Sequence, residues 1–544
     1  MDKFVLINQV YHHLPFTDSF AVHRGKVTIL TTPMPIEGCQ AYLHLNADSF
    51  IGRLPGLNML FLTEPIIVLP GHYDPLVWQH FDYIFTHYDK IIEMNPTKFK
   101  KALSPRTGLN IFPPITEDLW ERESKYPLEN RLKALCMVNG NKRSVVPGEL
   151  YSKRLEIALW FHLYGSLPFD VYGTPPFPIP NFKGTLAKEI RFKTIASYKY
   201  YLCFENIHHP VYSLGYADKI YDCLETRTLP IYLGTPDIEN YVPRECFIDF
   251  REFKNFRELN DFLENMDAQT YQTYIEHIDK WVGQGGLRPL SMHAIHEQIV
   301  EILALEKNIL ASDLYQGSQN WTPGVAAELT ELRWNPVIGK AFWTYEYLSQ
   351  ARSPLIDYQK EHFDLLSSNR QYLKKIDQLR LKNKLLEASR EFENLFCNGI
   401  FTSDLVYQHA QLLTDLSHFK ESQEKLQQVL LMKPNHSLAL NDLGGLFMLQ
   451  KDYAKAVEYF HSALSFDVRN DQALENLLSL LLSLNFKDYI AELIQKLLPL
   501  RSGDGDFLAI LKKYNLSIDP ENRKLSDELN PIPAVGGSPG HGIY

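Results

Sequence analysis

The sequence lacks any apolar stretch of about 20 residues, which is the length that a membrane-spanning helix requires. Its N-terminal residues also lack the apolar run of a signal peptide. Its six cysteines are scattered over 544 residues without a CxxC pair, a pattern that disfavours both a disulfide framework and a zinc site. These absences predict a cytoplasmic protein with reduced thiols and no transmembrane segment, which at most lies peripherally on the inner face of a membrane.

The chain has no excess of positive charge either. Its formal net charge is -10 at pH 7, whereas proteins that bind nucleic acid generally meet the phosphates with a basic surface. Nucleic acid is therefore not an expected partner. The hydrophobic content of 45% and the charged content of 22% are ordinary for a folded protein. At about 150 residues per domain, the length predicts about three domains.

Short β-rich runs alternate with helix-forming stretches through residue 250. This repeated order of strand, helix and strand predicts parallel sheets covered by helices, an α/β architecture. Strands are expected at 27–30, 59–64, 82–88, 134–140, 169–173, 200–206 and 229–234. Helices are expected at 149–165 and 216–228. We predict two α/β domains at 1–130 and 131–290, a helical linker at 291–399, helical repeats at 400–515 and a disordered tail at 516–544.

An internal repeat with a period of 34 residues occupies 405–500. Ala439 recurs as Ala473 in the next repeat, and small residues of this kind are needed where two helices cross closely. The pattern resembles the tetratricopeptide repeat, with Ala456 and Phe460 as a packing pair. We expect one clear repeat and two degenerate ones. Because such helices stack into a concave surface, the region is expected to bind a protein partner or to mediate self-association.

The stretch KYYLCFENIHHPVYSLGYADK, residues 199–219, combines polar groups with the end of an apolar strand. Glu205 and Asn206 come at the carboxyl edge of this strand, where ligands bind in open α/β sheets. Lys219 falls in the first turn of the next helix, where a cation is unfavourable unless an anion binds there. Asp218 could accept hydrogen bonds from sugar hydroxyls. The pattern predicts a nucleotide diphosphate site, with a simple Lys219–Glu205 ion pair as the alternative.

Residues 198–267 resemble the donor-binding half of the α1,3/4-fucosyltransferases, glycosyltransferase family 10. The run YKYYLCFEN, the segment YADK and the turn PIYLGTP occur here in the order that the family shows. The segment YADK is one residue shorter than the family's YVTEK and carries Asp in place of Glu. The resemblance implies a GT-B fold with two Rossmann-like domains, GDP-β-L-fucose as donor, and inversion at the anomeric carbon by a bacterial-type α1,3-fucosyltransferase. An acceptor of the N-acetyllactosamine type is expected.

The resemblance also assigns donor-binding residues within this stretch. Asn206 and Lys219 match donor-site positions, with the lysine on the diphosphate. Glu205 matches the family's glutamate, which is either structural or faces the nucleotide sugar. Tyr216 and Asp218 would contact ribose or fucose.

Three upstream residues complete the predicted site. Arg154 resembles an arginine on a helix that contacts the donor phosphates, and Asn139 ends a strand that would line the donor site. Glu64, which closes the run MLFLTE, matches the general base of the family. Such a base is needed because an acceptor hydroxyl is a poor nucleophile until a carboxylate takes its proton. Arg154 and Lys219 would stabilise the charge that develops on departing GDP.

No D-x-D motif precedes the donor site, so we predict no obligatory metal or other cofactor. The predicted partners are GDP-fucose and a glycan or glycoconjugate acceptor. Two alternatives stay open: a repeat scaffold whose transferase domain is inactive, and a transferase that uses another GDP-sugar.

Overall fold

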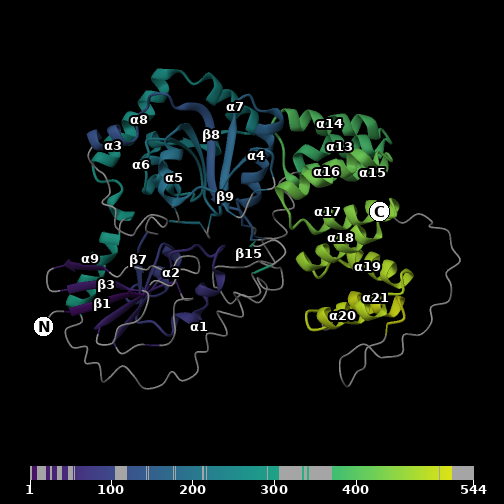
Figure 1. The fold of residues 1–544 in the computed structure, drawn as a ribbon, viewed down its shortest axis with the longest axis horizontal. Coiled ribbons are helices and arrows are strands. Elements are labelled where there is room, and N and C mark those ends of the chain that lie inside the picture. Colours follow the sequence, from purple (N-terminus) through teal and green to yellow (C-terminus); the bar gives the residue numbers. More distant parts are fainter. Residues whose placement is uncertain are drawn as a thin grey trace. The chain divides into compact units, whose positions relative to one another are not determined.

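A computed structural model shows the arrangement of the chain in two compact units (Figure 1). The first unit comprises Met1–Trp343, Tyr347–Lys374 and Glu393–Phe401, and the second comprises Thr344–Glu346, Lys375–Phe392 and Thr402–Tyr544. The structure describes residues 3–8, 20–24, 27–32, 39–46, 53, 56–103, 119–142, 144, 146–174, 177, 179–210, 213–215, 217, 219–290, 292–305, 334–335, 340–341, 370–501 and 503–516.

The first sheet of unit 1 has seven strands in the order β2-β3-β1-β4-β5-β6-β7. All neighbouring pairs are parallel except β2 and β3. The strands are β1 (Lys3–Asn8), β2 (Phe20–Arg24), β3 (Val27–Thr32), β4 (Ala41–Leu45), β5 (Leu57–Phe61), β6 (Tyr83–Thr86) and β7 (Phe99–Lys101). Every residue of β4 and β5 is buried, as expected for central strands of a parallel sheet with both faces covered.

Helix α9 (Met292–Leu305) follows the second sheet in sequence but belongs to the core of the first. Its residues Ile295 and Ile299 are buried in one cluster with Leu43 and Met59 of the sheet. Figure 1 shows α9 beside the strands β1 and β3. The chain therefore returns to the first sheet after it has completed the second. Two short helices, α1 (Pro75–Trp78) and α2 (Asp89–Met94), also belong to this part.

The second sheet has six parallel strands in the order β10-β9-β8-β11-β12-β13. They are β8 (Leu132–Gly140), β9 (Phe169–Thr174), β10 (Phe182–Gly184), β11 (Tyr198–Phe204), β12 (Leu229–Leu233) and β13 (Ile248–Asp249). Counted from β8, this is the order 3-2-1-4-5-6 of a doubly wound sheet, in which the direction of winding reverses between the first and fourth strands. Ligands of such sheets bind outside the carboxyl ends of the strands at this reversal.

The helices of the second sheet lie on both of its faces. Figure 1 shows α4 (Tyr151–Tyr164) on one side, and α5 (Lys188–Ile195) and α6 (Lys219–Glu225) on the other. This placement follows from right-handed crossovers, because the chain winds from β8 through β9 to β10 in one direction and from β11 through β12 to β13 in the other. Helices α7 (Phe256–Asn265) and α8 (Ala268–Gly283) follow the last strand.

Helix α4 is buried nearly all round, since ten of its 14 residues are buried. The indole N–H of Trp160 donates to the carbonyl of Phe396 at 2.9 Å, and Phe401 packs against Tyr164. The segment Glu393–Phe401 is therefore part of the first unit, although it is distant in sequence.

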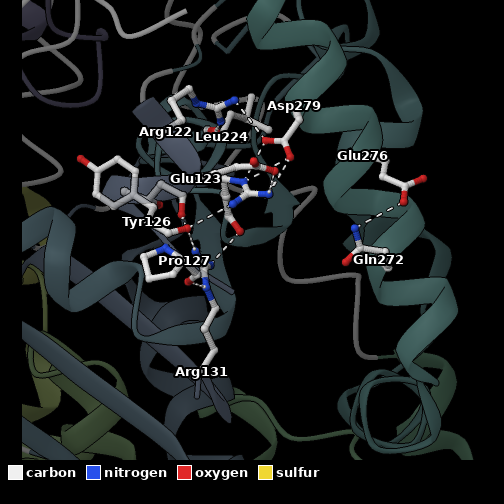
Figure 2. A network of polar contacts seen from close by, with 11 residues as sticks. Arg122, Glu123, Tyr126, Pro127, Arg131, Leu224, Gln272, Glu276 and Asp279 are labelled. Atoms are coloured by element: carbon white, nitrogen blue, oxygen red, sulfur yellow. Dashed lines mark hydrogen bonds and ion pairs between the residues drawn. The ribbon is translucent and has the colours of Figure 1, made fainter. Parts of the chain in front are cut away.

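A buried ionic network joins α3 (Leu119–Lys125) and α8 to the second sheet (Figure 2). The carboxylate of Asp279 accepts from Arg122 at 3.1 Å and from Arg227 at 2.9 Å. Arg131 donates to the carbonyls of Pro127 at 2.9 Å and of Tyr126 at 3.1 Å. Burial lowers the pKa of the Arg122 guanidinium, and Asp279 opposes this shift. The network lies at the amino ends of β8 and β12, so it supports the sheet at the end opposite to the carboxyl edge.

Unit 2 consists of helices that pair as hairpins. The first two are α13 (Arg370–Leu381) and α14 (Leu385–Cys397), of which unit 2 contains Lys375–Phe392. The others are α15 (Ser403–Asp415), α16 (Phe419–Met432), α17 (Ser437–Leu449), α18 (Tyr453–Phe466), α19 (Asp471–Ser483), α20 (Lys487–Leu497) and α21 (Gly505–Lys513). Two backbone features recur every 34 residues. The side chains that cap helices α15, α17, α19 and α21 belong to Thr402, His436, Asn470 and Asp504. The left-handed residue in the turn between paired helices is Asn383, Ser417, Lys451 and Asn485. The period of 34 thus extends beyond the one clear repeat that the sequence shows.

The predicted α/β region followed by helical repeats is confirmed. All seven predicted strands of the α/β region are present, and β1, β2, β4, β7, β10 and β13 are additional. A further short pair, β14 (Trp334–Asn335) and β15 (Lys340–Ala341), is antiparallel. Within the described ranges, no helix has the length and apolar character needed to cross a membrane. Most of the predicted tail, from residue 517 on, lies outside the described residues.

Candidate active site

Glu205 follows β11 directly and is fully buried. Its Oε1 accepts a hydrogen bond from the backbone N–H of Lys219 at 3.0 Å, and its Oε2 lies 3.3 Å from Nζ of the same lysine. Helix α6 begins at Lys219 rather than near Tyr216, and the carboxylate of Glu205 occupies the position at its first turn that the sequence suggested for a ligand phosphate. The ion pair named as the alternative for Lys219 is therefore present in the structure.

The side-chain oxygen of Asn206 accepts hydrogen bonds from two cationic side chains. Its Oδ1 accepts from Nη2 of Arg154 at 3.1 Å and from Nζ of Lys219 at 3.3 Å. Arg154 also donates through Nε and Nη2 to the carbonyl of Phe204 at 3.1 and 2.7 Å. Because α4 and α6 cover opposite faces of the sheet, the two helices supply positive charge from both sides to the carboxyl edge of β11. Burial lowers the pKa of Arg154, while Tyr151 and Glu205 oppose that shift.

Gly234 leaves the space that the Glu205 side chain fills. A Cβ at this position would lie 2.4 Å from Cγ of Glu205 and from the phenol oxygen of Tyr232. Nδ1 of His208 lies 2.6 Å from the carbonyl oxygen of Gly234. The loops after β11 and β12 are therefore held together at the edge of the sheet.

Asn139 lies near the carboxyl end of β8, the neighbour of β11. Its side chain is buried, and neither its Oδ1 nor its Nδ2 has a hydrogen-bond partner among the described residues. A buried amide without partners is rare in a folded protein. Together with Glu205 and Asn206, Asn139 flanks the point where the strand order reverses. The residues predicted on β8 and β11 therefore meet at the edge where such sheets bind ligands.

Glu64 comes three residues after β5 of the first sheet and is half-buried. Its backbone carbonyl accepts from the phenol of Tyr73 at 2.7 Å, which fixes the chain at this point. Burial raises the pKa of Tyr151 in α4 and Arg154 lowers it, while the negative charge of Glu64 raises it further. The carboxylate of Glu64 therefore acts electrostatically on a residue at the start of α4.

Two predicted donor-site residues, Tyr216 and Asp218, lie outside the described residues. Two other residues of the site, Gly234 and Tyr151, could not be recognised from the sequence. Gly234 was part of a recognised turn, but only the packed side chain of Glu205 shows why it must lack a Cβ. Tyr151 looks like any aromatic residue of a buried helix, and its sequence context carries no signal. In the part of the chain that the structure describes, no group of three or more His, Cys, Asp or Glu residues could hold a metal ion. That the reaction requires no metal stays a prediction.

Residues 133–301 match the model of the family described as glycosyltransferase family 10 (fucosyltransferase) C-term. The predicted resemblance to this family is confirmed for that segment, which contains every described donor-site candidate. Human alpha-(1,3)-fucosyltransferase 7 is 27% identical over 228 residues, which cover 41% of this chain and 59% of the relative. Human 3-galactosyl-N-acetylglucosaminide 4-alpha-L-fucosyltransferase FUT3 is 32% identical over 132 residues, which cover 24% of this chain and 33% of the relative. The chain thus spans between a third and three fifths of these relatives.

Solved structures match the two parts of the chain separately. An alpha1,3-fucosyltransferase covers 59% of this chain at 17% identity with a TM-score of 0.36, and 93% of that protein is matched. The tetratricopeptide-repeat protein YrrB covers 35% of this chain at 17% identity with a TM-score of 0.22, and 88% of it is matched. The strand order and the helix spacing given above define the fold independently of these matches.

Proposed function

We propose that this chain is an inverting glycosyltransferase that moves L-fucose from GDP-β-L-fucose to a glycan hydroxyl. The observation that carries the proposal is the shared contact of Arg154 and Lys219 with Oδ1 of Asn206. It places two cations at the point of strand reversal, where a doubly wound sheet binds a nucleotide. The family match of residues 133–301 supports fucose as the transferred sugar.

Residues of this chain can assist both the attack of the acceptor and the departure of GDP in the proposed reaction. Glu64 takes the proton from the acceptor hydroxyl, whose oxygen then attacks the anomeric carbon of fucose. The bond between that carbon and the β-phosphate oxygen breaks, and GDP leaves with the electron pair. Arg154 and Lys219 stabilise the negative charge that develops on the departing diphosphate. Attack from the face opposite to GDP inverts the configuration.

The test is an assay of purified protein with GDP-fucose and an array of acceptor glycans, among them N-acetyllactosamine. We expect a fucosylated product with an α1,3 linkage, and a donor screen with other GDP-sugars should show a preference for GDP-fucose. If neither transfer nor donor hydrolysis occurs under conditions in which a known fucosyltransferase is active, the proposal is wrong.

The ion pair between Lys219 and Glu205 supports a second candidate function. If this pair is permanent, the lysine is not available to a diphosphate, and the chain acts as a repeat scaffold with an inactive α/β region. Titration calorimetry with GDP separates the two candidates, because only the transferase is expected to bind the nucleotide.

A further inference from the structure

We propose that Tyr151 is a further donor-binding residue, whose phenol O–H donates a hydrogen bond to a diphosphate oxygen of the nucleotide sugar beside Arg154. This inference deepens the proposed function and rests on it for the class of ligand. Three independent observations support it: the place of Tyr151 in the fold, its unpaired hydroxyl, and the charges around it.

Tyr151 is the first residue of α4, and the segment before it is fixed to the end of β11. The backbone N–H of Leu150 donates to the carbonyl of Asn206 at 3.0 Å. Glu149 forms an isolated antiparallel bridge with Ile207. The start of α4 therefore lies beside the residues that follow β11, at the point where the strand order reverses.

The hydroxyl of Tyr151 is buried and has no hydrogen-bond partner among the described residues. Tyr201 and Tyr73 of the same unit are paired, since Tyr201 donates to the carbonyl of Val138 at 2.9 Å and Tyr73 donates to that of Glu64. The buried hydroxyl of Tyr271, at the far end of the second sheet, also lacks a hydrogen-bond partner within the described part of the chain, but of the two only Tyr151 lies beside the residues that follow β11. An unpaired buried hydroxyl costs free energy, because it has lost its hydrogen bonds to water. A ligand that accepts a hydrogen bond from Tyr151 would remove this cost only in the bound state.

The charges around Tyr151 select the kind of ligand. The guanidinium of Arg154 lies 5.2 Å from the centre of the tyrosine ring. Arg154 uses Nε and Nη2 for its bonds to Phe204 and Asn206, and its Nη1 has no hydrogen bond to a described residue. Burial and the carboxylates of Glu64 and Glu149 raise the pKa of Tyr151 despite Arg154, so the phenol stays protonated and acts as a donor. A neutral donor beside a cation favours an anionic oxygen such as that of a phosphate.

The test compares Tyr151→Phe with Tyr164→Phe in the full-length protein. Tyr164 is the last residue of the same helix, and its phenol forms no hydrogen bond to a described residue. The Kd for GDP is measured by titration calorimetry, and the Tm by thermal unfolding. We expect Tyr151→Phe to raise the Kd about tenfold or more, the effect of losing a hydrogen bond to a charged group. Its Tm should be unchanged or higher, because no internal hydrogen bond is lost. Tyr164→Phe should leave the Kd unchanged.

The outcomes separate this inference from the proposed function. If Tyr151→Phe is folded and binds GDP like the unchanged protein, the inference is wrong even if fucose is transferred. The inference is equally wrong if only kcat falls, since the phenol would then contact the acceptor. If the GDP Kd depends on Tyr151 but no sugar is transferred, the inference stands and the proposed function fails. A chain that does not bind GDP overturns both.

Discussion

Glu205 holds Lys219 at two points, since it accepts from the backbone N–H at 3.0 Å and lies 3.3 Å from Nζ. The second distance is longer than the 2.7–2.9 Å that is usual for a charge-assisted hydrogen bond. The backbone contact fixes the start of α6, and the ammonium also contacts Oδ1 of Asn206 at 3.3 Å. One carboxylate can therefore both shape the site and hold its cation.

Lys219→Met should destabilise the fold by about 3–5 kcal/mol, because it leaves the carboxylate of Glu205 buried without its cation. The double variant Glu205→Gln/Lys219→Met removes both charges and should regain most of this loss. Neither variant should bind GDP with the affinity of the unchanged protein. Chemical unfolding and calorimetry measure the two effects. Equal stability of the single and double variants would show that the ion pair has no structural role.

Glu64→Gln should lower kcat by about 10²- to 10⁴-fold, the usual contribution of a general base. GDP binding should be retained, because in the proposed reaction the general base contacts the acceptor hydroxyl and not the diphosphate. Asp74→Asn is a suitable control, since Asp74 caps the nearby helix α1 through a side-chain oxygen that asparagine retains. Loss of transfer and of GDP affinity together in Glu64→Gln would indicate a structural role instead.

The sequence was sufficient for seven of the 13 described strands in the two sheets, because these are apolar runs that end at polar residues. Glu205 and Asn206 could be predicted at a ligand-binding edge from their position after β11 alone. The strand β4 was missed, and its sequence AYLHL contains the buried His44, which interrupts the apolar pattern. The ion pair between Glu205 and Lys219 was named only as an alternative, because a residue's position after a strand does not show which group caps the next helix. The unpaired hydroxyl of Tyr151 could not be predicted either, since the burial of a group without a hydrogen-bond partner is a property of the packed structure.

Asp279→Ala should destabilise unit 1 by about 3–5 kcal/mol, because it leaves the buried Arg122 and Arg227 without their shared carboxylate. Glu123→Ala is the matched control. Glu123 also contacts Arg227, at 3.2 Å, but its side chain is 51% exposed, so its loss should cost only about 0–1 kcal/mol. Urea unfolding of both variants measures the difference. An equal loss of unfolding free energy in the two variants would mean that burial does not determine how much these ion pairs contribute to stability.

Acid should destabilise unit 2 through His409. Burial lowers the pKa of this histidine to about 3, with a smaller contribution from Lys425, whereas an unfolded histidine titrates near 6.5. Between these values only the unfolded chain takes up the proton, so stability falls as the pH drops below about 6.5, by at most about 1.4 kcal/mol per pH unit. His409→Gln should reduce the difference in unfolding free energy between pH 7 and pH 5, and the exposed His418→Gln should not. An unchanged difference in His409→Gln would contradict the prediction.

A truncated chain of residues 1–401 should keep GDP binding and transfer to small acceptors. It retains Phe396, which accepts from Trp160, and Gly399, whose carbonyl accepts from the backbone N–H of Phe256 at 3.2 Å. A chain of residues 1–391 lacks both contacts and should have a lower Tm. Comparing the two truncations separates loss of the repeats from damage to the first unit. A folded 1–401 chain that is inactive on small acceptors would show that the repeats take part in the reaction.

The constant spacing of caps and turns in unit 2 limits how this part of the gene can change length. A duplication or deletion of 34 codons adds or removes one cap, one helix pair and one turn together, as in the segment that begins at the cap Asn470 and contains the turn residue Asn485. A change of any other size alters the length of a helix or turn in the repeat in which it falls. The number of repeats in unit 2 can thus change in steps of 34 residues while the sequence of the α/β region stays the same.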